Sequence, residues 1–163
     1  MLEVKPTRKN VRAKTLASGL LLLSVTAFAA SSLLSVYKVL LQGVGLLLLI
    51  PLIQITARYL VLQYLYRVRA RDDGGADLEV FTYRGGARMQ LVCRVGLDEI
   101  VRVAPYDAAD KKPPRGVRRY KYHPDMAPRE GLLLFVENGD GKCEILLAHD
   151  ERLCLLLMRG KTV

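Results

Sequence analysis

Two apolar runs decide the fold of this chain: Leu16–Val36, LASGLLLLSVTAFAASSLLSV, and Val39–Ala57, VLLQGVGLLLLIPLIQITA. Each run has about 20 residues, and a helix of that length, rising ~1.5 Å per residue, is about 30 Å long, the thickness of a bilayer's hydrocarbon core. Lys38 is the only charged residue from the start of the first run to the end of the second. The sequence therefore predicts an integral membrane protein with a transmembrane hairpin at residues 16–63, its helices at about 16–36 and 39–62.

Basic residues flank the two runs unevenly. Residues 1–15 carry five Lys or Arg residues, and Arg67, Arg69 and Arg71 follow the second run, whereas the short connection carries only Lys38. Segments on the cytoplasmic side of a span are enriched in Lys and Arg. We therefore expect residues 1–15 to be a basic cytoplasmic tail, both termini to be cytoplasmic, and the chain to be a multi-pass protein of the plasma membrane.

An alternative is that the first run is a cleaved signal peptide. The basic tail, the apolar stretch Leu16–Val25 and the sequence Ala27-Phe28-Ala29 match the three regions of such a peptide. Against this, the apolar character continues through Ala30–Val36, which makes a full span. The sequence leaves cleavage open, but the soluble domain is expected in the cytoplasm in both cases, because the second span remains.

Small residues recur at three- and four-residue steps in the first predicted helix. Ser24, Ala27, Ser31 and Ser35 share a face and allow another helix to approach closely. They form the candidate helix-packing face. Its natural partner is the second helix of the same chain, and the alternative is a homodimer seam.

The remaining residues, 64–163, show a pattern typical of strands. Alternating residues between glycine-containing turns predict strands at about 64–71, 77–84, 88–96, 99–104, 117–123, 131–137 and 142–148. Asp150 can then cap a short amphipathic helix in which Leu153, Leu156 and Leu157 share one face. We expect one cytoplasmic domain, a mainly antiparallel β-barrel or roll of about seven strands with one short C-terminal α-helix.

Five segments in residues 60–160 carry a family resemblance: Tyr64-Leu65-Tyr66-Arg67-Val68-Arg69, Leu78-Glu79-Val80, Leu97-Asp98-Glu99-Ile100, Val103-Ala104-Pro105-Tyr106-Asp107 and Tyr120-Lys121-Tyr122. Together with the final strand and helix, they resemble small bacterial membrane proteins in which a two-helix transmembrane hairpin precedes a pleckstrin-homology-like (PH-like) domain. The resemblance implies a PH-like fold for residues 64–163. It implies no catalytic residues, since members of the family are mostly of unassigned function. The chain contains no Trp, so the phosphoinositide recognition of eukaryotic relatives is not carried over.

The main surface feature is a basic segment at residues 111–121. It contains Pro and Gly and no acid, so we expect it to be exposed. Its cations are Lys111, Lys112, Arg115, Arg118, Arg119 and Lys121. They predict contact with an anionic surface, either lipid headgroups or an acidic protein partner, and each cation near an anionic leaflet contributes ~1 kcal/mol. The plain alternative is a solvated loop that balances an acidic remainder.

Other function classes have weaker support. An accessory subunit of a membrane complex could bind a partner protein through a sheet edge or a helix groove. Nucleic acid is an unfavoured partner, although Tyr120 and Tyr122 could stack on bases, because the chain is tethered to the bilayer. The chain lacks G-x-S-x-G, P-loop, H-E-x-x-H and C-x-x-C motifs, and Cys93, Cys143 and Cys154 are expected to be buried free thiols. We therefore expect a non-catalytic binding or scaffolding protein without metal or cofactor.

Overall fold

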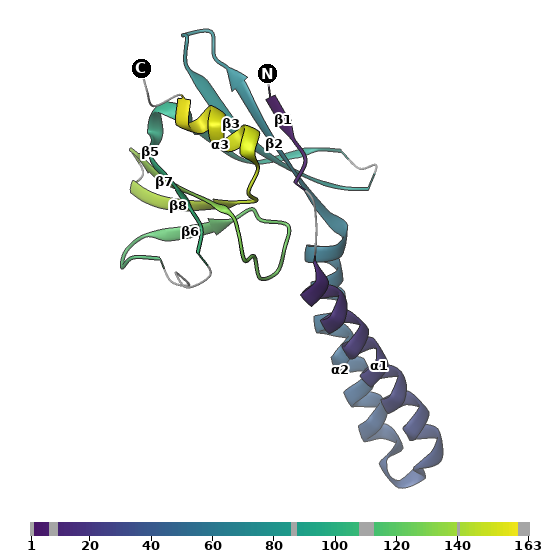
Figure 1. The fold of residues 1–163 in the computed structure, drawn as a ribbon. Helices are drawn as coiled ribbons and strands as arrows, with labels where there is room; N and C mark the ends of the chain where they lie inside the picture. The colour runs from purple at the N-terminus through teal and green to yellow at the C-terminus, as the bar shows by residue number, and fades with distance from the viewer. Residues whose placement is uncertain (1, 7–9, 86–87, 108–112, 140, 160–163) are drawn as a thin grey trace. The chain divides into compact units, whose positions relative to one another are not determined.

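The computed structural model describes residues 2–6, 10–85, 88–107, 113–139 and 141–159. The chain divides into two compact units. One unit is Lys9–Leu62 and the other joins Met1–Arg8 to Gln63–Val163. Figure 1 shows the first as a helical hairpin and the second as a β domain.

The hairpin consists of α1, Val11–Leu33, and α2, Lys38–Ile55, joined by a 3-10 turn at Ser35–Tyr37. A π-helical segment, Thr56–Val61, continues α2. α1 begins at Val11, inside the segment predicted as a basic tail. A helix can include polar residues before an apolar run starts, so hydropathy alone did not locate its first turn. Both helices are long and apolar enough to cross a membrane.

The first sheet has the strand order β1-β2-β3-β4. Its strands are β1 (Leu2–Val4), β2 (Leu62–Ala70), β3 (Ala76–Arg84) and β4 (Gln90–Gly96). β1 pairs antiparallel with β2, with Glu3 opposite Arg67. The predicted number of seven strands is therefore wrong: the described residues form eight. β1 was missed because three residues are too few to show an alternating pattern.

The second sheet has the order β5-β7-β8-β6. Its strands are β5 (Ile100–Pro105), β6 (Arg118–Lys121), β7 (Leu132–Asn138) and β8 (Gly141–Leu147). β7 is antiparallel to β5 and to β8, and β6 is parallel to β8. The two sheets do not close into a barrel, so that part of the prediction is wrong, whereas antiparallel β structure followed by a short C-terminal helix is confirmed.

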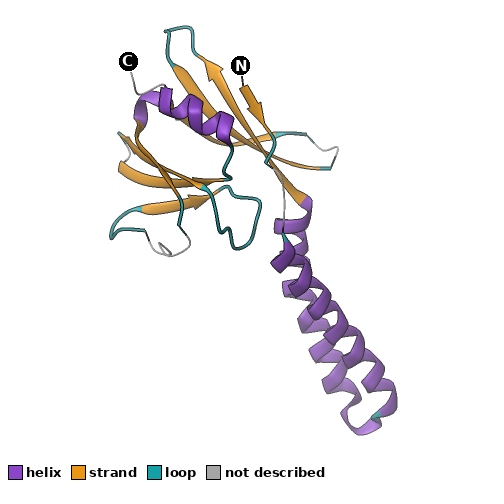
Figure 2. Cartoon of the chain, in the orientation of Figure 1, coloured by secondary structure: helices purple, strands orange, loops and turns teal. Residues whose placement is uncertain are grey.

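The core of the β domain draws on both sheets and on α3, Glu151–Arg159 (Figure 2). Its fully buried side chains include Leu65, Leu78, Leu134, Ile145 and Leu153. Asp150 caps α3 as predicted: one of its carboxylate oxygens accepts hydrogen bonds from the backbone N–H groups of Arg152 and Leu153, at 3.0 and 3.1 Å.

Buried Tyr66 links β2 to the segments that follow β6 and β8. Its hydroxyl donates to the Tyr122 carbonyl at 2.7 Å and accepts from the Ala148 N–H at 3.1 Å. Burial raises the pKa of Tyr66 well above its ordinary value. This side chain therefore serves as a neutral structural contact within the domain.

Candidate binding surfaces

The basic segment at residues 111–121 does not present all its cations to solvent. Arg115, Arg118 and Lys121 are exposed, whereas Lys111 and Lys112 lie outside the described residues. The Arg119 side chain is only 5% exposed, and its Nε lies 2.6 Å from Oε2 of Glu144, which is 1% exposed. The expected exposure is therefore wrong at Arg119.

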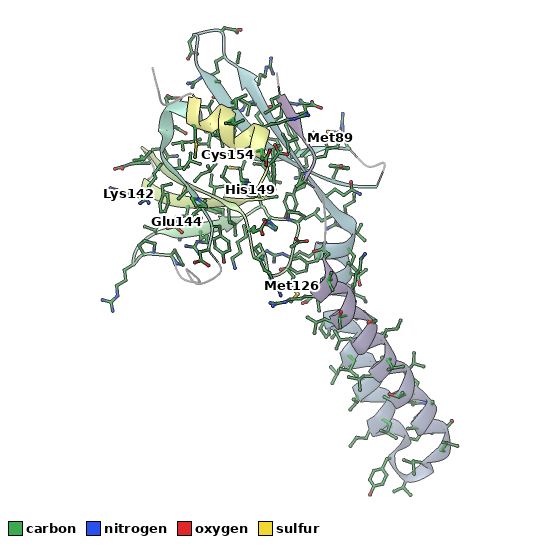
Figure 3. The ribbon with its side chains drawn as sticks, viewed as in Figure 1. Met89, Met126, Lys142, Glu144, His149 and Cys154 are labelled. Carbon is green, nitrogen blue, oxygen red and sulfur yellow. The ribbon has the colours of Figure 1, made fainter. Side chains whose placement is uncertain are left out.

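Strand register explains why Arg119 is buried. Arg119 lies opposite Glu144, Glu144 opposite Phe135, and Phe135 opposite Arg102, so these four residues form a row across β6, β8, β7 and β5. The Arg102 guanidinium lies 5.6 Å from the centre of the Phe135 ring. Figure 3 shows Glu144 within the second sheet. The contacts along this row hold neighbouring strands of the second sheet together. Arg119 is therefore a structural residue.

Three tyrosines connect the two sheets. The rings of Tyr64 on β2 and Tyr122 after β6 meet edge to face, with centres 6.5 Å apart, and Tyr120 on β6 stacks on Tyr122 at 6.4 Å. The Tyr122 hydroxyl also donates to the Val92 carbonyl on β4, at 3.4 Å. The pKa of Tyr122 is raised to about 12, mainly because the hydroxyl is partly buried. The two-residue spacing of Tyr120 and Tyr122 was visible in the sequence, but the contact of Tyr122 with β4 was not.

The β3–β4 hairpin exposes apolar side chains. Val80 pairs with Cys93 and Phe81 with Leu91, so Val92 is an extra residue in β4 that forms a β-bulge. Leu91, Val92 and Met89 are all exposed. In a regular strand, consecutive side chains point to opposite faces, and one face is buried. The bulge interrupts this alternation, so the consecutive residues Leu91 and Val92 are both exposed.

A charged cleft of about 410 Å³ lies around the β2–β3 turn. Arg71 contacts Asp77 at 3.3 Å and Asp98 at 2.7 Å, and Arg94 contacts Glu79 at 2.5 Å. The cleft's lining residues are Arg69, Ala70, Arg71, Asp72, Asp73, Asp77, Glu79 and Arg94. Its acids pair with the charges of Arg71 and Arg94, so this cluster stabilises the turn and offers little attraction to an anion.

The candidate helix-packing face lies mainly against α2 of the same chain. Ser24 and Ser31 are buried and Ala27 is half-buried, while Ser35 lies in the 3-10 turn. The Ser24 hydroxyl donates to the Gly45 carbonyl on α2, at 3.0 Å. Small residues therefore allow a direct hydrogen bond between the two helices.

Reactive side chains do not gather elsewhere in the described residues. The part of the chain that the structure describes contains no group of three His, Cys, Asp or Glu that could hold a metal ion. Cys93, Cys143 and Cys154 are free and half-buried rather than fully buried, and burial raises the pKa of the Cys93 thiol. Searches against family models, curated proteins and solved structures found no match to this chain.

Proposed function

We propose that this protein is a non-catalytic integral membrane protein that presents a β domain for binding or scaffolding at the cytoplasmic face of the plasma membrane. One observation carries the proposal: two apolar helices lie, in sequence, between β1 and β2, and these two strands pair with each other. The segments before and after the helices therefore belong to the same sheet. Two membrane crossings return the chain to the side on which it started, so both strands can lie on the same side of the bilayer.

The surface of the hairpin supports burial in lipid. Leu22, Leu47 and Ile53 are among many large apolar side chains that the chain itself leaves exposed. Covering one such side chain is worth about 1.5–3 kcal/mol, so a bilayer provides a large driving force. The helices keep their backbone hydrogen bonds internally, as a spanning segment requires.

The pairing of β1 with β2 also favours a permanent first helix. Cleavage after Ala29 would remove β1 and most of α1, and with them the Glu3–Arg67 ion pair at 2.6 Å and the Ser24–Gly45 hydrogen bond. We therefore propose that the first apolar segment is retained as a span. The basic residues that flank both helices favour a cytoplasmic location for the shared sheet.

The β domain supports binding rather than catalysis in this proposal. Two mainly antiparallel sheets with a C-terminal helix are compatible with the PH-like resemblance, and PH-like architecture is part of what we propose. Among the described residues of the basic segment, the exposed cations that would face anionic headgroups are Arg115, Arg118 and Lys121. Function on such a fold depends on its surfaces, because fold alone does not define activity.

Cysteine labelling in intact cells tests the proposed topology. In a full-length variant without its native cysteines, Val36→Cys places one thiol at the exposed turn of the hairpin and Lys142→Cys places one on the exposed surface of the β domain, away from the basic segment. A membrane-impermeant maleimide should label Val36→Cys in intact cells and Lys142→Cys only after lysis. Labelling of Lys142→Cys from outside, or extraction of the protein by alkaline carbonate, would contradict the proposal.

A further inference from the structure

We infer that the β domain makes a second contact with the bilayer, through a surface that docks on anionic lipid headgroups. The surface consists of four exposed apolar or aromatic side chains and two exposed cations, and we call it the tether-end surface. Its members are Met89, Leu91, Val92, Tyr120, Arg88 and Lys121. The inference rests on the proposed function, because it requires α2 to lie in the membrane.

Covalent connection brings this surface close to the bilayer. β2 begins at Leu62, the residue directly after the second candidate span, which ends at Val61. Tyr64 is two residues further on, about 7 Å along a strand that rises ~3.3 Å per residue. The Tyr64 ring contacts Tyr122, whose hydroxyl contacts the bulged Val92 of β4. Tyr120, Tyr122 and the bulge of β4 therefore lie at the end of the β domain where β2 begins, directly after the candidate span.

The exposed side chains match an interfacial environment. Met89 is 49%, Leu91 42%, Val92 38% and Tyr120 43% exposed. Tyrosine is enriched at membrane–water interfaces, where its ring lies at the level of the headgroups. A patch of this kind on a soluble surface signals an interaction site.

Charge favours an anionic leaflet as the occupant. Residues 80–97 and 113–124 contain no acid, and among their cations Arg94 and Arg119 already pair with Glu79 and Glu144 from other segments. Arg88 and Lys121 are exposed, and Arg84 adds a third exposed cation on the hairpin. The apolar side chains are thus bordered by cations, which is the arrangement that binds anionic headgroups and the outer part of the acyl region.

The edge of β4 is poorly suited to a protein strand. Addition of a strand requires free backbone N–H and C=O groups in regular register. The bulge at Val92 interrupts this register, and the Val92 carbonyl already accepts the Tyr122 hydroxyl. Side chains rather than backbone groups therefore make the contact.

Single tryptophans provide the test, because the natural chain contains none. Met89→Trp reports on the tether-end surface, whose Met89 Figure 3 shows on the β3–β4 hairpin. Leu155→Trp, on the exposed face of α3, is the matched control, and Leu47→Trp on α2 reports insertion of the hairpin. Each full-length variant is placed in nanodiscs of phosphatidylcholine mixed with phosphatidylglycerol, with and without brominated acyl chains, which quench tryptophan on contact.

We expect brominated lipid to quench Met89→Trp and Leu47→Trp and to leave Leu155→Trp unchanged. Quenching of Met89→Trp should fall when Arg84 and Arg88 are both changed to Glu, and in nanodiscs of phosphatidylcholine alone. If Leu47→Trp is quenched but Met89→Trp is not, the inference is overturned while the proposed function stands. If Leu47→Trp is not quenched, the proposed function itself fails. If Met89→Trp is shielded from water in native membranes but is not quenched in nanodiscs, the surface binds a protein partner, and the inference is also overturned.

Discussion

Replacement of Arg119 by alanine should strongly destabilise the β domain. The carboxylate of Glu144 is 1% exposed and lies 2.6 Å from Nε of Arg119, whose guanidinium also lies 5.8 Å from the centre of the Tyr106 ring. Removal of one partner from a buried ion pair costs about 3–5 kcal/mol, because the other charge stays buried without compensation. For a domain of this size, each kcal/mol lowers Tm by roughly 4–8 °C, so we expect a decrease in Tm of more than about 10 °C.

Two comparisons make this prediction specific. Arg118 is the adjacent residue in the same strand and is exposed, so Arg118→Ala should change the free energy of unfolding by no more than about 0.5 kcal/mol. The double variant Arg119→Met with Glu144→Leu removes both charges and should recover most of the stability. Unfolding of the full-length protein in detergent, followed by near-ultraviolet circular dichroism, measures all three variants. Equal effects of the Arg118 and Arg119 substitutions, or a double variant less stable than Arg119→Ala, would refute the reasoning.

Three further predictions concern the hairpin, α3 and a buried histidine. Gly45→Ala should destabilise the helix pair by roughly 1–3 kcal/mol, because the added Cβ would lie 2.9 Å from the Phe28 ring. The control Gly43→Ala adds a Cβ that meets nothing within 4 Å and should leave thermal unfolding unchanged. Asp150→Ala should lower the free energy of unfolding in denaturant titrations by about 1 kcal/mol through loss of the α3 cap, and an unchanged midpoint would exclude this role. Burial lowers the pKa of His123, so the unfolded state binds the proton more readily and stability should fall as the pH drops below about 6.5. His123→Asn should make unfolding less dependent on pH in this range, and an unaltered profile would assign the dependence to other groups.

Short-range patterns were sufficient for most of the secondary structure. The apolar runs predicted both helices, and alternation between glycine turns predicted seven of the strands, because neighbouring residues along the chain carry these signals. The position of Asp150 directly before an amphipathic stretch likewise predicted the cap of α3. The three-residue β1 was missed because its signal was too short.

The candidate surfaces depended much more on long-range pairing. In the sequence, Arg119 is one of six similar cations, and only the parallel pairing of β6 with β8 places it against Glu144. Tyr64, Tyr122 and Val92 are likewise far apart in the chain, and their contact depends on how two sheets pack. No local pattern distinguishes a cation that faces solvent from one that faces a buried carboxylate.

The sequence by itself determined the apolar hairpin, the antiparallel β domain and the C-terminal helix, because hydropathy and periodicity act over a few neighbouring residues. The tertiary structure alone decided that β1 pairs with β2, that Arg119 is buried, and that the Val92 carbonyl accepts a hydrogen bond from Tyr122. Each of these features brings together residues that are distant in sequence, and the interaction stabilises the protein only after folding has placed those residues in contact.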